Sequence, residues 1–267
     1  MRATITVSLR ICLGLGLAAP SLPQQLMIPE SSTDQVMLLD AVDGSLLDAS
    51  FIDLRSSGAP ALIPIEAIRV DDEIWITDQV ADAVMRYSAD GSFFLGKLEP
   101  GLDNARGIAV APGGVFVANG SLPGPGSGDA LKKLSGGGAL IGSYPAVEPY
   151  DLLLLGDELL VGNVHDHDIE RYDLAGNSLG VFHDSDGVTG INFPEQLTRK
   201  RSNGNVLAAG FATPAGIYEY SIATGAVSGG EAPERIRSSG GLSVPTTLLQ
   251  ASRGAAPEAR SASGTST

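Results

Sequence analysis

A strand-rich pattern of about 45 residues recurs along this chain of 267 residues and constrains its fold more than any other feature. Residues 26–52 align with residues 74–98 at a constant offset, so that Glu30 matches Asp78. Each copy shows an apolar strand, a polar turn, a second strand, a Gly-containing hairpin turn and a third strand. The five copies cover residues 26–52, 74–98, 115–144, 159–182 and 206–227.

A further apolar run of strand length precedes four of the copies, at residues 64–70, 104–110, 148–155 and 193–199. Counted from Glu66, the corresponding positions are Arg106, Tyr150 and Glu195, at spacings of 40, 44 and 45. A four-stranded unit cannot bury both of its faces alone and stacks on its neighbours, which predicts an all-β fold, a β-propeller of four-stranded blades. A generic β-sandwich is the alternative, although its strands need not recur in groups of four.

The composition favours short strands and tight turns over long helices, because 34 residues are Gly, 16 are Pro and only 5% are aromatic. The formal net charge of -14 repels phosphate backbones and anionic headgroups. We therefore expect neither nucleic acid nor a membrane as a partner. A cation, a sugar or a basic partner is a more natural ligand than an anion.

The first residues are predicted to be a signal peptide. Residues 1–23 contain Arg2 and Arg10, no acidic residue and the apolar run Ile11–Ala19. This run is too short to cross a bilayer core of about 30 Å, so a membrane anchor is disfavoured. An ordinary buried first strand is the alternative. Removal of the segment, which includes Cys12, leaves a secreted or periplasmic bacterial protein without a thiol.

The remaining chain is predicted to have three parts. Residues 24–230 form the propeller with five recognisable blades, whereas residues 231–250 repeat the pattern only faintly. We expect residues 231–250 to be an incomplete sixth blade or a closing segment that pairs with the first blade, which lacks an inner strand. Residues 251–267 contain hardly any large apolar side chain, so we expect a disordered tail.

The copies resemble NHL-type repeats. The segments DEIWITDQVADAVMRYSADG (72–91) and GIAVAPGGVFVAN (107–119) show a strand ending in Asp or Asn, an Arg–apolar–Tyr strand and Gly turns. The resemblance covers residues 26–227 and implies a six-bladed propeller group that includes gluconolactonase-like and streptogramin-lyase-like enzymes and many extracellular binding proteins. This chain departs from the group in having five clear blades. Either the end of the chain is truncated, or the ring closes with the weakly matching residues that follow the fifth copy.

The main candidate site lies where the predicted inner strands surround a channel, because several blades can hold a ligand there. Glu66, Asp151 and Glu195 could supply oxygen ligands to Ca²⁺, because the coordination geometry of this ion is flexible. The resemblance to gluconolactonase-like enzymes implies the same three residues as metal ligands. In the alternative, Arg106 neutralises one carboxylate and the others are solvated at the channel mouth. The channel-lining candidates are Glu66, Arg106, Tyr150, Asp151, Glu195 and Gln196.

Two other motifs resemble metal sites but are better explained as loops. His165 and His167 would point the same way on a strand, yet they align with a turn of the second copy, so we expect a solvated loop at 165–168. Residues 184–195 have the length of a calcium loop, but Val188 and Thr189 stand where an oxygen ligand and the obligatory Gly belong. We therefore expect a turn between blades.

Polar residues at strand ends are interpreted structurally. Asp78, Asn119 and Asn163 end the second strands of three copies and match Glu30 of the first. We expect their side chains to bond backbone amides of the following turn. The basic triplet at residues 199–201 precedes a hairpin turn and is interpreted as solubilising it.

The sequence favours a non-catalytic binding or interaction module, a monomer whose ligand is a protein, a carbohydrate or a small molecule. It contains no Gly-rich phosphate loop, Ser nucleophile elbow or dinucleotide fingerprint, so no residue is assigned as catalytic. Two alternatives stay open. One is a Ca²⁺-dependent hydrolase or lyase of gluconolactonase-like type that uses the channel carboxylates, and the other is an inactive remnant.

Overall fold

The computed structural model describes residues 25–59, 62–121, 126, 128–213 and 215–228. The predicted signal peptide (1–23), the closing segment (231–250) and the tail (251–267) lie outside the described residues. Within the described ranges, the regular structure consists of β-strands and one short 3-10 helix, η1 (Leu54–Ser57). No helix in this part of the chain is long and apolar enough to span a bilayer.

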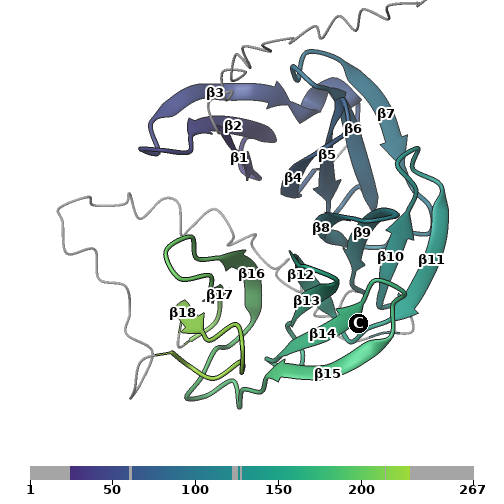
Figure 1. Cartoon of the computed structure of the whole chain (residues 1–267). Helices are drawn as coiled ribbons and strands as arrows, with labels where there is room; N and C mark the ends of the chain where they lie inside the picture. The colour runs from purple at the N-terminus through teal and green to yellow at the C-terminus, as the bar shows by residue number, and fades with distance from the viewer. Residues whose placement is uncertain (1–24, 60–61, 122–125, 127, 214, 229–267) are drawn as a thin grey trace, which may run out of the picture.

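The strands form five antiparallel sheets, which we call blades one to five (Figure 1). Blade one contains β1 (Gln25–Glu30), β2 (Gln35–Asp40) and β3 (Leu46–Asp53), and blade two contains β4 (Pro64–Val70), β5 (Glu73–Asp78), β6 (Ala83–Ser88) and β7 (Phe94–Leu98). Blade three contains β8 (Ala105–Ala111), β9 (Gly114–Asn119), β10 (Ala130–Leu134) and β11 (Leu140–Pro145). Blade four contains β12 (Pro149–Leu155), β13 (Glu158–Asn163), β14 (Ile169–Asp173) and β15 (Ser178–His183), and blade five contains β16 (Pro194–Arg199), β17 (Val206–Gly210) and β18 (Gly216–Tyr220).

The blades are arranged around a series of edge strands, of which β4, β8, β12 and β16 are the inner strands of blades two to five. β1, β4, β8, β12 and β16 each stand at one edge of their sheet, and each contacts the next in this series. The other strands fan outward from this series as the chain passes from blade one to blade five (Figure 1). The prediction of an all-β propeller is confirmed. Blades two to four have the expected four strands, and blades one and five have three each within the described residues.

The repeat found in the sequence is also a repeat of strand register. Glu30 opposes Gln35 in blade one, and Asp78 opposes Ala83 in blade two. Each residue of the first pair is therefore separated from its counterpart in the second pair by the same 48 residues. β1 therefore occupies the place of a second strand, and among the described residues blade one has no inner strand. At the other end of the described chain, Val227 forms an isolated antiparallel bridge with Tyr220 of blade five.

The apolar core lies between the blades. The middle strands β5, β9 and β13 are buried along almost their whole length because a neighbouring blade covers each face. The outermost strands β7 and β11 instead alternate between more and less exposed residues. Separate clusters fill the four seams; Trp75 belongs to the seam between blades two and three, Phe116 to the next and Leu160 to the last.

Both ends of the described chain leave strand edges, which gives a prediction about truncation. A chain ending at Thr224 loses the pairing of Val227 and Ser228 with β18, and any pairing that residues 233–249 supply to β1. We expect this truncation to lower the melting temperature or to cause aggregation through exposed strand edges. Deletion of residues 251–267 is expected to change neither, which differential scanning fluorimetry and size-exclusion chromatography can check. Equal stability of the two truncated chains would contradict the prediction.

Candidate functional site

The inner strands place the channel candidates in two rows. Each inner strand has a register shift after its first residue, and the first residues Pro64, Ala105, Pro149 and Pro194 all oppose the last residue of the second strand. Counted from these residues, one row contains Ile65, Arg106, Tyr150 and Glu195, and the next row contains Glu66, Gly107, Asp151 and Gln196. In the strand register, Arg106 therefore corresponds to Ile65, and Glu66 corresponds to Gly107, one residue away from the sequence alignment.

Glu66 and Asp151 each tie one inner strand to the next. An oxygen of Glu66 on β4 accepts a hydrogen bond from the Ile108 amide on β8, at 2.7 Å. Asp151 on β12, which is only 4% exposed, accepts a short hydrogen bond from the Leu197 amide on β16. Two of the predicted ligand-binding carboxylates therefore hold neighbouring blades together.

Between these two carboxylates stands Gly107, which occupies the same repeat position on β8. A Cβ atom on Gly107 would lie 2.6 Å from both the Asp151 Cα atom and the Tyr150 carbonyl oxygen. The missing side chain lets β8 and β12 approach closely and lets the Asp151 carboxyl group bond to that of Glu66. Sequence reasoning missed Gly107, although an alignment of the inner strands that allowed for the bulge would have placed it beside two acids.

The Glu66 and Asp151 carboxyl groups interact through a side-chain hydrogen bond, and both have a raised pKa. Burial, followed by the negative charge of Asp151, raises the pKa of Glu66 well above its usual value. Burial likewise raises the pKa of Asp151 to about 6, against the lowering effect of its hydrogen-bond donors. A hydrogen bond between two carboxyl groups requires one of them to be protonated, so the pair carries at most one negative charge while this bond is present.

Arg106 organises the second row of candidates. Its guanidinium group is almost completely buried, lies 4.9 Å from the centre of the Tyr150 ring, and donates to the Pro149 carbonyl oxygen. Its carboxylate partner is Glu148, with an Nη2 to Oε1 distance of 3.4 Å. Sequence reasoning missed Glu148, which immediately precedes β12. The predicted neutralisation by Arg106 thus involves a carboxylate outside the candidate set.

Glu195 lies beside Arg106 and Tyr150 and is half-buried. Burial raises the pKa of Glu195 to about 7, although the positive charge of Arg106 opposes the shift. Burial, and then the charge of Glu195, raises the pKa of Tyr150 as well. Gln196, the remaining candidate, is exposed. Glu195 is therefore the candidate carboxylate that is bonded neither to Glu66 nor to an inner-strand amide.

The described residues do not gather a set of metal ligands. No group of three or more His, Cys, Asp or Glu side chains in this part of the chain is placed to hold a metal ion. Glu66 and Asp151 face each other, whereas Glu195 belongs to the group around Arg106. The assignment of Glu66, Asp151 and Glu195 as calcium ligands stays a prediction that this geometry does not favour.

The loop at residues 165–168 is only partly solvated. His165 and Asp166 are exposed and lie 3.8 Å apart, as expected for a loop. Asp168, however, is only 7% exposed, and one of its carboxylate oxygens has no partner among the described residues. Burial, together with the charges of nearby acids, raises its pKa to about 7. Asp186 accepts the amides of Val188 and Thr189, so the calcium-like segment is a capped turn, as predicted.

The strand-end residues behave mostly as predicted. Asp78 accepts the amides of Val80 and Ala81 in the turn after β5. Asn163 and Glu30 bond to their own following turns in the same way. Asn119 differs, because its side chain bonds to Asp103 and Gly128 and so links two loops.

Charge is distributed unequally between the two ends of the propeller. The name 'channel end' is used for the end of the propeller at which the inner strands start. In the described loops that connect strands at this end, Arg55 is the one Lys or Arg residue. The corresponding loops at the far end contain five carboxylates and two basic side chains. The ten carboxylates of the channel-end loops are Asp34, Asp82, Glu99, Asp103, Asp129, Glu148, Asp166, Asp168, Asp184 and Asp186.

The fold and this site define a β-propeller with an acidic channel end. The sequence matches no protein-family model and no curated protein sequence. Among solved structures, the chain is similar to one from a nidogen/laminin complex, with a TM-score of 0.58 and 15% identity over 75% of each chain.

Two lyases are also similar in structure. A streptogramin B lyase gives a TM-score of 0.53 at 17% identity over 76% of this chain. The virginiamycin B lyase of Staphylococcus aureus, solved as a catalytically inactive histidine-to-alanine variant with quinupristin, gives 0.50 at 15% identity over 74% of this chain. The chain spans 66% of the length of each lyase. Identities this low establish the propeller fold alone.

Proposed function

We propose that this chain is a secreted, non-catalytic β-propeller that binds a cationic ligand, such as a basic segment of a partner protein, at its channel end. The observation that carries the proposal is the excess of ten carboxylates over one basic side chain in the described loops of that end. Such a field attracts positive charge and speeds its association. Glu195, half-buried beside Tyr150, is the channel residue that contacts the ligand.

The use of the other carboxylates supports a binding role over a catalytic one. Glu66 and Asp151 bond to each other and to inner-strand amides, so their hydrogen-bonding capacity goes into the fold. A general base or a metal ligand needs an oxygen free to meet its substrate or ion. We therefore expect the ligand to contact the acidic loops of the channel end and not the carboxyl groups that are bonded to each other.

The histidines give a second argument against lyase chemistry. The S. aureus lyase variant is inactive with one histidine replaced by alanine. The three histidines of this chain all lie outside the inner strands: His165 is in an exposed loop, His167 packs against Phe193, and His183 bonds to the carbonyl oxygen of Gly225. None of them lies on an inner strand beside Glu195.

A labelled lysine-rich peptide can test the proposal by fluorescence anisotropy. We expect saturable binding that weakens with added salt. Combining Asp103→Asn with Asp184→Asn at the channel end is expected to weaken binding about fivefold, as is Glu195→Gln. The matched control combines Asp71→Asn with Asp72→Asn, which removes the same charge from the far end and is expected to change affinity less than about twofold.

Two outcomes would overturn the proposal. The first is equal weakening by the two Asp→Asn pairs, which would mean that net charge alone attracts the peptide. The second is hydrolysis of a lactone that depends on millimolar Ca²⁺ and is lost when Glu66→Gln, Asp151→Asn and Glu195→Gln are combined. That result would support the metal-dependent enzyme instead.

A further inference from the structure

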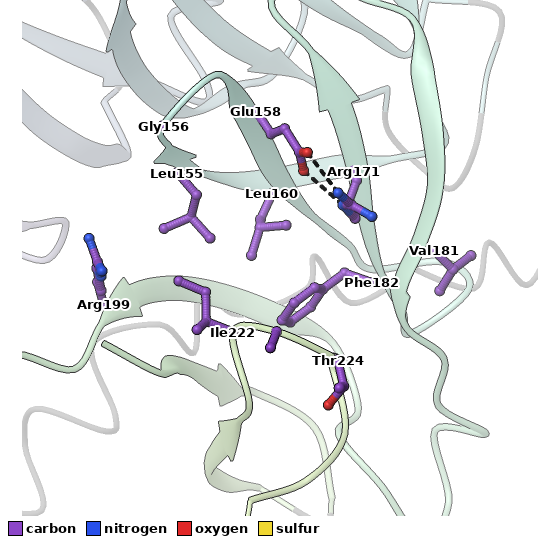
Figure 2. A pocket seen from close by; sticks show the side chains of 11 residues that line it. Leu155, Gly156, Glu158, Leu160, Arg171, Val181, Phe182, Arg199, Ile222 and Thr224 are labelled. Carbon is purple, nitrogen blue, oxygen red and sulfur yellow. Dashed lines mark hydrogen bonds and ion pairs between the residues drawn. The ribbon is translucent and has the colours of Figure 1, made fainter. Parts of the chain in front are cut away.

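A pocket of 430 Å³ lies in the seam between blades four and five, at the far end of the propeller. It is bounded by the turn after β12, by the strands β14 and β15, by the end of β16 and by the turn after β18. In Figure 2, the apolar side chains line the space between two arginines, Arg171 and Arg199. The apolar side chains that form its floor are Leu155, Leu160, Phe182 and Ile222.

The pocket exists because one repeat position carries a smaller side chain in blade four. Trp75, Phe116 and Leu160 are equivalent, since they oppose Arg86, Lys133 and Arg171 on the following strands. All three are fully buried in the seam to the next blade. A leucine has a much smaller volume than a tryptophan or a phenylalanine, and in the last seam the leucine is among the residues that line the pocket.

The basic side chains that oppose these three residues have different interaction partners in the three blades. In blade two, Arg86 pairs with Glu73 and lies 6.0 Å from the centre of the Trp75 ring, and in blade three Lys133 lies 4.9 Å from the centre of the Phe116 ring. In blade four, Arg171 makes two hydrogen bonds to Glu158, of 2.8 and 2.7 Å, and has no aromatic ring beneath it.

Arg199, at the other side of the pocket, is the cation available to a ligand. Among the described residues, its guanidinium group has no carboxylate partner and makes one long hydrogen bond, of 3.3 Å, to the Gly204 carbonyl oxygen. The neighbouring Lys200 is paired with Glu219. The basic triplet was interpreted as solubilising the turn; the exposed Arg199 side chain also lines the pocket.

We propose that this pocket binds a small organic anion with an apolar body, an aromatic or aliphatic carboxylate or sulfonate. The body lies on Leu155, Leu160 and Phe182, and the anionic group meets the Arg199 guanidinium. Burial of apolar surface supplies the affinity, and a planar guanidinium group recognises an oxyanion through two parallel hydrogen bonds. The site is separate from the acidic channel end, and the inference does not depend on the function proposed above.

The fluorescent anion 8-anilinonaphthalene-1-sulfonate is a suitable probe, because its emission rises when it enters an apolar site. We expect the folded protein to bind it at one saturable site and octanoate to displace it. Leu160→Trp, which copies the residue of blade two, fills the pocket and is expected to abolish binding. Arg199→Met removes the charge with little loss of apolar volume and is expected to weaken binding about tenfold.

Arg69→Met is the matched control. Arg69 stands at the same repeat position at the end of β4, is exposed, and bonds to the carbonyl oxygen of Ala89. This variant removes the same charge at another seam and is expected to bind the probe as the unchanged protein does. Leu160→Phe, which copies Phe116, serves in the same assay if the larger tryptophan prevents folding, as judged by thermal melting.

The proposal fails if the folded protein shows no saturable probe binding. It also fails if a pocket-filling variant with an unchanged melting temperature binds the probe as before, because the probe would then occupy another surface. Equal weakening by Arg69→Met and Arg199→Met would show a response to net charge alone. Loss of binding in the Leu160 variants, with weakening specific to Arg199→Met, supports the site.

Discussion

Replacing Gly107 by alanine is expected to lower the free energy of unfolding by about 2–3 kcal/mol. The added Cβ atom would lie 2.6 Å from two backbone atoms, the Asp151 Cα atom and the Tyr150 carbonyl oxygen. Backbone atoms of a packed sheet cannot rotate away as a flexible side chain can. The inner strands β8 and β12 must therefore separate, which also pulls the Asp151 carboxyl group away from Glu66. Urea denaturation followed by circular dichroism measures the change.

Gly216→Ala provides the matched control for this prediction. Gly216 also lies in a strand, β18, but a Cβ atom there would meet only the edge of the Tyr218 ring, at 3.9 Å. An ordinary contact at that distance, with less backbone entropy to lose on folding, is expected to leave stability unchanged or slightly raised. If Gly107→Ala is as stable as Gly216→Ala, the close approach of β8 and β12 does not exist in solution.

The fold could be predicted from the sequence because the repeat is local and periodic. The blades repeat antiparallel strands in the same order, and the offset that matched Glu30 with Asp78 is the offset of the strand register itself. The same alignment gave the first copy no inner strand, and blade one has none among the described residues. Which residues face each other across blades depends instead on the bulge at the start of each inner strand. A bulge shifts side-chain positions by one residue without changing the apolar pattern.

The candidate site was predicted less well, because its geometry depends on residues that have no reactive or charged side chain. The sequence placed the acids Glu66 and Asp151 on inner strands, but their pairing requires the missing side chain of Gly107 between them. The pocket between blades four and five depends in the same way on Leu160, where two other blades have an aromatic residue. Comparison of equivalent positions between repeats could have found both, whereas a search for reactive residues could not.

The buried carboxyl groups make stability depend on pH. Burial raises the pKa of Glu66 well above 4.5, that of Asp151 from 3.8 to about 6 and that of Glu195 from 4.5 to about 7. The folded chain therefore binds more protons than the unfolded chain between about pH 4 and pH 7, and the free energy of unfolding falls as pH rises through this window. Exposed groups with a lowered pKa, such as Asp90 and Glu219 at about 2, act in the opposite sense, but only below this window.

Glu66→Gln should remove much of this dependence. The glutamine side chain can still accept the hydrogen bond from the Ile108 amide, and its own amide group can donate to Asp151, as a protonated Glu66 does. We expect the free energy of unfolding at about pH 8 to rise by about 1–2 kcal/mol, and its difference between about pH 5 and pH 8 to shrink. Asp157→Asn removes one charge from the exposed turn after β12 and is expected to leave the pH profile parallel to that of the unchanged protein. A Glu66→Gln profile that also runs parallel would show that Glu66 and Asp151 do not share a proton, because a shared proton is released on unfolding and must appear in the slope.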